Sequence, residues 1–229
     1  MYWPYYFDWT ILLILPGIII AAWAQSRVNK AYRVYSKIPA GSGVTGREAA
    51  ARILQQNGIT DVGVEAAHGL LTDNYNPRKK TLNLSEANYS GSSIAAVAVA
   101  AHESGHALQH KTGFFPLQIR SAIAPVVSIA SYALWPLLIF GVLAGLAQQA
   151  INLAVYIFLG IFVFQLITLP VEYNASRRAL AALVDGGMLS EEEIYGAKSM
   201  LGAAALTYVA ATLIALLNVL RFMALSRRR

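Results

Sequence analysis

Four long apolar stretches alternate with polar segments along this chain of 229 residues. The stretches run from about 5 to 24, 123 to 147, 151 to 171 and 200 to 220. A helix of about 20 apolar residues crosses the hydrocarbon core of a bilayer, so each stretch is long enough to span one. The pattern predicts four transmembrane helices, of which the second and third form a hairpin around the polar residues Gln148 and Gln149.

The first stretch has the flanks of a membrane anchor. It lacks the basic start and the small-residue cleavage site of a removable signal peptide. Aromatic side chains gather at its start, as they do where a helix meets the membrane interface. These aromatic residues are Tyr2, Trp3, Tyr5, Tyr6 and Trp9.

The polar region between the first two stretches predicts a small α+β fold. Thr45 and Glu48 have the spacing of a capping box, which opens a helix that stops at Gly58. Residues 59–85 have little helical periodicity, and the turn signals at 74–80 predict a loop that leads into residues 81–85. Leu82 and Leu84 alternate with polar neighbours and predict a short strand with one buried face.

A helix that begins at residues 90–93 continues through an unbroken apolar run, 94–101. Eight apolar residues are too few to span a bilayer, so the run predicts a buried helix. This helix leads directly into His102.

Composition agrees with a membrane protein. The apolar fraction is 56% and the charged fraction 13%, against roughly 45–50% and 25% for soluble domains. The net charge is +6, but the basic residues flank apolar spans or lie in loops, which argues against nucleic-acid binding and for contact with lipid headgroups. The chain has no cysteine, which excludes disulfides, cysteine-based zinc sites and thiol catalysis.

The segment His102-Glu-Ser-Gly-His106 carries the chemistry of a metal site. Residues i and i+4 share one face of a helix, so His102 and His106 can offer two imidazole nitrogens to one zinc ion. Glu103 lies beside the first histidine, where it can act as general base on a zinc-activated water. The alternative, two histidines on an ordinary helix face, would bury polar groups at a cost.

A catalytic zinc needs a third protein ligand. His110 continues the histidine row, but on a straight helix it lies about 12 Å along the axis from His102, too far to share an ion. Glu172 follows directly on the third apolar stretch, and a carboxylate at that depth is by default functional. Because the predicted hairpin crosses the membrane twice, Glu172 returns to the side of His102 and His106. The alternative for Glu172 is a side chain that reaches out to the membrane surface.

At these residues the chain resembles the YugP-type neutral zinc metallopeptidases, relatives of membrane gluzincins such as the HtpX-type heat-shock proteases. The resemblance rests on three segments and covers most of the chain. The segments are 73–85, His102-Glu-Ser-Gly-His106 and Leu169-Pro-Val-Glu172-Tyr-Asn-Ala-Ser-Arg-Arg178.

The resemblance implies zinc-dependent hydrolysis of peptide bonds, with Glu172 in the place of the glutamate ligand. It also implies that the strand at 82–85 is the edge strand on which an extended substrate is laid. One position departs from the broader gluzincin pattern, because Ser176 stands where an aspartate supports a histidine. Ser176 and Asn174 are the candidates for that support.

Three other residues stay without a catalytic role. His68 could contact substrate or stabilise an oxyanion, but an ordinary loop histidine is the simpler interpretation. Arg177 and Arg178 are interpreted as a cation pair at the membrane surface.

The distribution of cations predicts the orientation. Eleven of the 18 basic residues fall between Gln25 and Arg120, and the amino-terminal flank has none. The positive-inside rule places this region, and the zinc site with it, on the cytoplasmic face of the cell membrane. The basic carboxyl terminus, Arg221 and 227–229, conflicts with four full crossings, which leaves open whether the last stretch spans.

We therefore expect a mostly α integral membrane protein, with about four transmembrane helices and a small α+β, zincin-like catalytic region. The expected parts are a transmembrane anchor (1–24), a membrane-surface catalytic region with the HExxH helix (25–120), a transmembrane hairpin (121–171), a third-ligand segment (172–199), and a transmembrane helix with a basic tail (200–229).

The leading hypothesis is a zinc endopeptidase that acts on membrane-associated proteins or peptides, with His102, His106 and Glu172 as zinc ligands and Glu103 as the catalytic base. The alternative is a membrane scaffold or adaptor that retains zinc without proteolytic activity, in which Glu103 would be unnecessary. A transporter is disfavoured, because the spans carry no ionisable residue at mid-depth and no inverted repeat.

Overall fold

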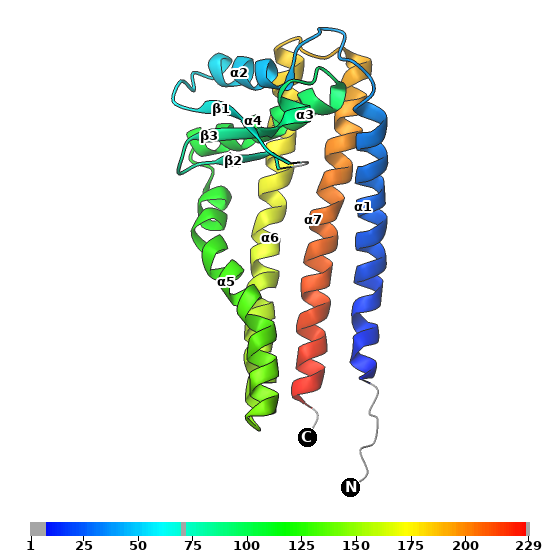
Figure 1. Cartoon of the computed structure of the whole chain (residues 1–229), viewed down its shortest axis with the longest axis vertical. Helices are drawn as coiled ribbons and strands as arrows, with labels where there is room; N and C mark the ends of the chain where they lie inside the picture. Colours follow the sequence, from blue (N-terminus) through cyan, green and yellow to red (C-terminus); the bar gives the residue numbers. More distant parts are fainter. Residues whose placement is uncertain (1–7, 70–71, 228–229) are drawn as a thin grey trace. The chain divides into compact units, whose positions relative to one another are not determined.

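The chain folds mainly as helices, with one small sheet (Figure 1). The computed structural model describes residues 8–69 and 72–227. Two short helices are the 3-10 helix η1 (Trp9–Ile14) and α3 (Glu86–Tyr89), and the strands are β1 (Gly63–Ala67), β2 (Asn74–Asn76) and β3 (Thr81–Ser85). The other helices are α1 (Leu15–Tyr35), α2 (Gly46–Gln56), α4 (Ile94–Lys111), α5 (Phe115–Leu143), α6 (Ala147–Asp185) and α7 (Glu191–Ser226).

The prediction of a mostly α membrane protein with four spans and a small α+β part is confirmed. Four helical segments among the described residues are long and apolar enough to cross a membrane: Trp9–Tyr35, Phe115–Leu143, Ala147–Asp185 and Glu191–Ser226. Most of them extend beyond the predicted apolar stretches into polar sequence. The turn of the hairpin differs from the prediction: α5 ends at Leu143, before the predicted end at 147, and Gln148 and Gln149 lie in the first turn of α6. Of the predicted aromatic group, Trp9 is 50% exposed, whereas Tyr2, Trp3, Tyr5 and Tyr6 lie outside the described residues.

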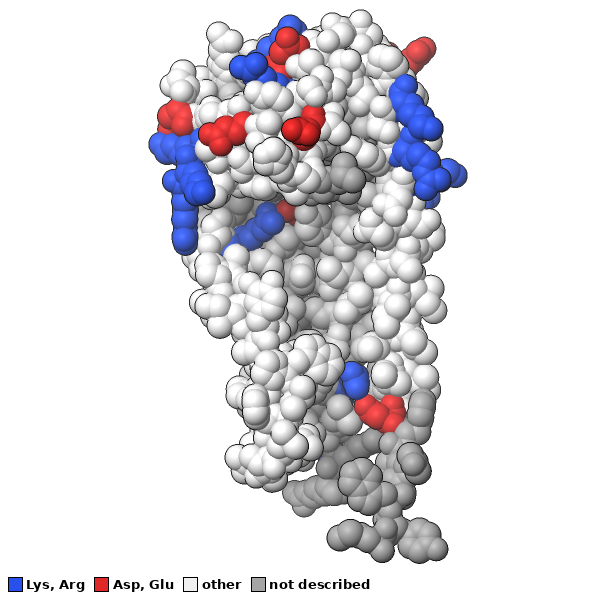
Figure 2. Space-filling model, viewed as in Figure 1, with Lys and Arg blue, Asp and Glu red and all other residues white. Residues whose placement is uncertain are grey.

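The chain divides into two compact units. We call residues 1–23, 119–168 and 207–229 the membrane unit, and residues 24–118 and 169–206 the sheet unit. In the described part of the membrane unit the charged residues are Asp8, Arg120, Arg221 and Arg227, and all other described charges belong to the sheet unit. On the face in view, Figure 2 shows most Lys, Arg, Asp and Glu side chains in one region, with few elsewhere.

The sheet has the strand order β1-β3-β2, with β1 parallel and β2 antiparallel to β3. Leu82 and Leu84 of β3 are fully buried, as their alternation with polar residues predicts. They join the core that α2 and α4 form around Ile53, Leu54 and Val97.

Two predictions about this sheet are wrong. The strand at 82–85 is the central strand and not an edge, because β1 and β2 pair with its two sides. The segment from Asn74 to Asn76, expected as a loop, is the edge strand β2. Asparagine is a poor strand former, so β2 depends on its partner: it pairs with β3, and Asn83 Nδ2 donates to Asn74 Oδ1 at 3.0 Å.

Side-chain caps begin three of the helices, and the predicted capping box at Thr45 is confirmed. Thr45 and Glu48 make both hydrogen bonds of a capping box at the start of α2, and Ser190 and Glu193 do the same at the start of α7. At the start of α4, Ser93 Oγ accepts from the Ala96 N–H at 3.2 Å. The Ser93 cap marks where α4 begins, and the start of the helix determines which residues its buried face brings to the site.

Candidate metal centre

Helix α4 places the two histidines of the HESGH segment side by side. Its first two turns are held in the core of the sheet unit, where Ala95, Val97 and Ala98 are fully buried. His102 and His106 follow one turn apart, and their ring centroids are 4.9 Å apart.

Helix α6 brings Glu172 to the same point. Glu172 Oε2 lies 3.2 Å from His102 Nε2 and 3.6 Å from His106 Nε2. One ligand atom from each of the three residues lies within 4.8 Å of the others, and the Glu172 side chain is almost fully buried. Two imidazoles and a carboxylate form the donor set of a catalytic zinc site that keeps one position open. The residues therefore fit a zinc ion.

A glycine allows α4 and α6 to come this close. A Cβ atom at Gly105 would lie 2.4 Å from the carbonyl oxygen of Ala175, a separation that real Cβ atoms do not adopt. Ala175 is itself fully buried. The glycine inside HESGH is thus a packing requirement: it brings the α6 backbone within reach of both histidines.

His102 is oriented from α6. Its Nδ1 lies 3.1 Å from Ser176 Oγ, and its Nε2 faces Glu172. Ser176 lies one helical turn after Glu172, so one face of α6 supplies both the carboxylate and the hydroxyl.

His106 is oriented by Gln109, which sequence reasoning missed. Gln109 Oε1 lies 3.0 Å from His106 Nδ1, and Gln109 Nε2 donates to Val171 O at 2.7 Å and to Asn174 Oδ1 at 3.1 Å. Because the amide nitrogen is fully used by α6, the amide oxygen faces His106 and accepts from Nδ1–H. That tautomer leaves the lone pair of Nε2 directed at Glu172.

The Gln109 network continues along α6. Asn174 does not contact a histidine, but its Oδ1 also accepts from Arg178 Nε at 2.8 Å. Asn174 therefore acts on the site through Gln109, and Arg178 fixes the amide orientation of Asn174. In the sequence, the available signal was a glutamine three residues after the second histidine, which belongs to no known motif. Its complete burial is seen only in the structure.

Glu103 lies beside the three clustered residues and is 9% exposed. The pKa of Glu103 is raised to about 7, mainly by burial and further by the carboxylates of Glu172 and Asp73, against the opposing effect of His102. The backbone N–H of Tyr75 on β2 donates to the Glu103 side chain. A carboxylate with a pKa near neutrality is suited to accept and return a proton.

Comparison with known proteins shows the family of the chain. The model of a family described as "Putative neutral zinc metallopeptidase" matches residues 10–227. The chain belongs to this family. A relative described as "Putative membrane protease YugP" from Bacillus subtilis (strain 168) is 46% identical over 212 residues, which cover 93% of this chain and 94% of the relative. No solved structure matches the chain.

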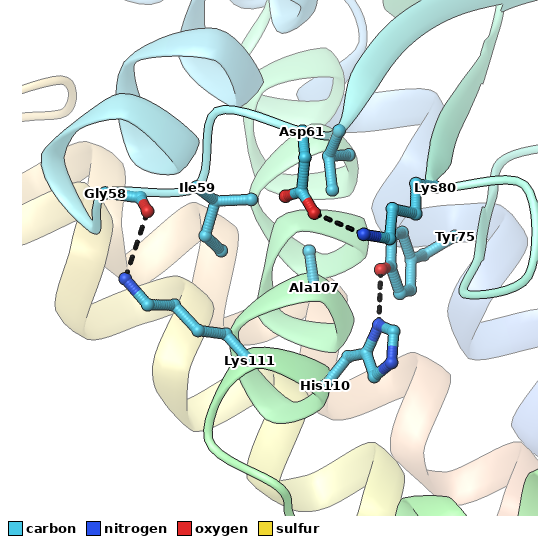
Figure 3. Close-up of a pocket in the computed structure, with 9 residues that line it drawn as sticks. Gly58, Ile59, Asp61, Tyr75, Lys80, Ala107, His110 and Lys111 are labelled. Carbon is cyan, nitrogen blue, oxygen red and sulfur yellow. Dashed lines mark hydrogen bonds and ion pairs between the residues drawn. The ribbon is translucent and has the colours of Figure 1, made fainter.

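His110 lies outside the three-residue group. It is exposed, and its Nδ1 is 2.7 Å from the Tyr75 hydroxyl at the rim of a pocket of about 300 Å³ (Figure 3). Glu103, Ala107 and His110 follow one face of α4 at helical spacing. Tyr75 therefore contacts this face twice, through its backbone at Glu103 and through its ring at His110.

His68 has no contact with the group either. Its side chain is fully exposed, and its Nδ1 lies 4.0 Å from Glu86 Oε1. Arg177 is exposed at the surface of α6. Neither His68 nor Arg177 belongs to the group of three candidate metal ligands.

Proposed function

We propose that this protein is a membrane-bound zinc endopeptidase in which His102, His106 and Glu172 hold the metal and Glu103 is the general base. The observation that carries the proposal is the convergence of three ligand atoms within 4.8 Å, with each histidine held by a separate hydrogen bond. When bound, zinc activates a water molecule toward the peptide carbonyl.

The protein residues then handle the protons. Glu103 accepts a proton from the attacking water and returns it to the amine that leaves when the peptide bond breaks. Its burial beside His102 supports this role, because a carboxylate of raised pKa both takes up and releases a proton near neutral pH. Ser176 and Gln109 keep the two imidazoles in one tautomer and orientation.

The substrates are proteins or peptides close to the bilayer, and the site faces the cytoplasm. The position of Glu172 in a helix that is long and apolar enough to span supports the first point. The concentration of basic residues between Gln25 and Arg120 supports the second.

The test compares wild type with Glu103→Ala in proteoliposomes, with casein as an unfolded protein substrate and with zinc measured by metal analysis. Both proteins should retain about one zinc per chain, and only wild type should cleave. Glu65→Ala, which removes an exposed carboxylate on β1, is the matched control and should cleave normally.

Equal cleavage by wild type and Glu103→Ala would rule out the proposed base. The scaffold alternative makes a different prediction in cells: Glu172→Ala should abolish function while Glu103→Gln leaves it intact. Proteomic comparison of membranes from wild-type and Glu103→Ala strains should reveal the substrates, as proteins that accumulate only in the variant.

A further inference from the structure

A cationic cavity lies between α1 and α7, outside the metal centre. It has a volume of about 280 Å³ and is lined by Arg27, Lys30 and Tyr35 of α1 and by Ser199 of α7, with small apolar residues between them. Its lining includes two cations and no acid. Arg33 adds a further cation to the same part of α1.

The helices are held together at one end of this cavity. A Cβ atom at Gly196 would lie 2.7 Å from Cε1 of Tyr35, so only glycine lets the tyrosine ring pack against α7. The two helices are antiparallel. The cavity lies along both of them, from Tyr35 and Ser199 near this contact toward Arg27 and Ala203. Beyond Arg27, α1 continues into its apolar, membrane-spanning part.

The lining matches one chemical group. Arginine and lysine bind phosphate through charge-assisted hydrogen bonds, and the hydroxyls of Tyr35 and Ser199 can add neutral donors. A phosphate with acyl chains would place its headgroup among these residues and its chains along the apolar part of α1. We propose that this cavity binds the phosphate headgroup of an anionic phospholipid. The proposal does not depend on the protease activity.

The general preference for cations beside a span does not account for these features. Positive charge next to an apolar stretch orients the helix in the membrane, whichever face of the helix carries that charge. It requires neither a cavity nor hydroxyls from a second helix. Moving one cation to another face of α1 therefore separates a specific site from a diffuse attraction.

The decisive variant is Asn29→Lys combined with Lys30→Gln, which keeps the net charge and moves the ammonium about 100° around α1. Asn29 is exposed and makes one exposed hydrogen bond, with Gln25, so little else is lost. Ser199→Ala removes a hydroxyl without any change of charge. Lys79→Gln, which neutralises an exposed cation between β2 and β3, is the control.

Native mass spectrometry of the purified full chain in detergent would measure the binding of added phosphatidylglycerol against phosphatidylcholine. Wild type and Lys79→Gln should bind phosphatidylglycerol preferentially, and the relocated-lysine variant should bind it roughly fivefold more weakly, which corresponds to about 1 kcal/mol. Ser199→Ala should weaken binding less.

Three results would overturn the proposal: equal binding of the two lipids by wild type, undiminished binding by both cavity variants, or displacement of phosphatidylglycerol by equimolar inorganic phosphate. The last result would assign the cavity to free phosphate. Unchanged zinc content and thermal unfolding of each variant would show that the cavity, and not the fold, was altered.

Discussion

The spans of the membrane unit and the metal centre of the sheet unit form most of their side-chain hydrogen bonds in different ways. In the spans of the membrane unit, hydroxyl and amide groups donate to the carbonyl four residues earlier in their own helix. The pairs are Ser131 with Val127, Thr168 with Phe164, Thr212 with Tyr208, and Asn218 with Ile214. Contacts between its elements include Arg221 with Asp8, Gln148 with Ser226 and Ser226 with Asn152, and they lie at or near helix ends.

In the sheet unit, most polar groups around the metal ligands bond between elements, whereas Ser104 donates to Ala100 O within α4. Gln109 of α4 donates to α6, and Ser176 of α6 contacts His102 of α4. Asp73, just before β2, accepts from the backbone N–H of Ser85 at 2.8 Å and from Asn88 Nδ2 at 3.0 Å. A span in lipid can satisfy its polar groups within one helix, whereas the site exists only when separate elements meet.

The largest expected effect comes from forcing α4 and α6 apart. Gly105→Ala places a methyl group against the Ala175 carbonyl, and overpacking of this kind costs about 1–3 kcal/mol. The shift moves Glu172 away from both histidines, so we expect zinc affinity to fall roughly 100-fold. Competition with a chelator of known affinity measures the loss.

Gly202→Ala on α7 is the matched control, because a Cβ atom there meets nothing within 4 Å. This change should leave zinc affinity intact and raise stability slightly, by about 0.5–1 kcal/mol, through helix propensity. Equal zinc affinities of the two variants would contradict the proposed role of Gly105.

A smaller effect is expected where one orienting group is removed without a change of volume. Gln109→Met keeps the side-chain length but removes the acceptor of His106 and both donors to α6. We expect zinc affinity to fall roughly 10- to 100-fold, since outer hydrogen-bond partners of metal ligands contribute about that much. Gln55→Met, at an exposed position of α2, should change nothing. Normal zinc affinity of Gln109→Met would show that His106 needs no orienting partner.

Ser176 should have the mildest effect in the sheet unit. It is only partly buried, so water can replace the hydroxyl in Ser176→Ala, and we expect about a tenfold loss of zinc affinity at most. Ser176→Asp should act in the opposite direction, because a carboxylate next to Nδ1–H raises the basicity of His102. Isothermal titration of the metal-free variants measures both changes, and changes of the same sign would refute the interpretation.

The same contrast explains what the sequence could predict. Hydropathy identified the four spans, and capping residues such as Thr45 and Ser93 marked helix starts, because these signals are local. HExxH spacing identified the α4 histidines, and the even number of crossings predicted that Glu172 would return to them. Each inference used only residues close in sequence or the topology of the chain.

What could not be predicted depends on contacts between elements. Gln109 belongs to no periodic pattern, and its role arises only when α6 lies against it. Two of the three residues of β2 are asparagines, which are poor strand formers, so the strand depends on its pairing with β3, a contact that the local sequence does not show. Gly105 is at one of the two unspecified positions of HExxH. The sequence does not indicate that Ala175 of α6 packs against it.

The smallest effect is expected in the membrane unit, and it tests the comparison directly. Thr212→Val is nearly isosteric and removes a hydroxyl that donates at 2.8 Å to Tyr208 O of its own helix. That carbonyl also serves the helix ladder, so the variant should stay within about 0.5 kcal/mol of wild type and keep its zinc affinity. Thermal unfolding and zinc titration, run beside Gln109→Met, measure both quantities. A loss of zinc affinity in Thr212→Val as large as that in Gln109→Met would mean that polar groups in the spans are coupled to the site, and that the two units do not satisfy their polar groups independently.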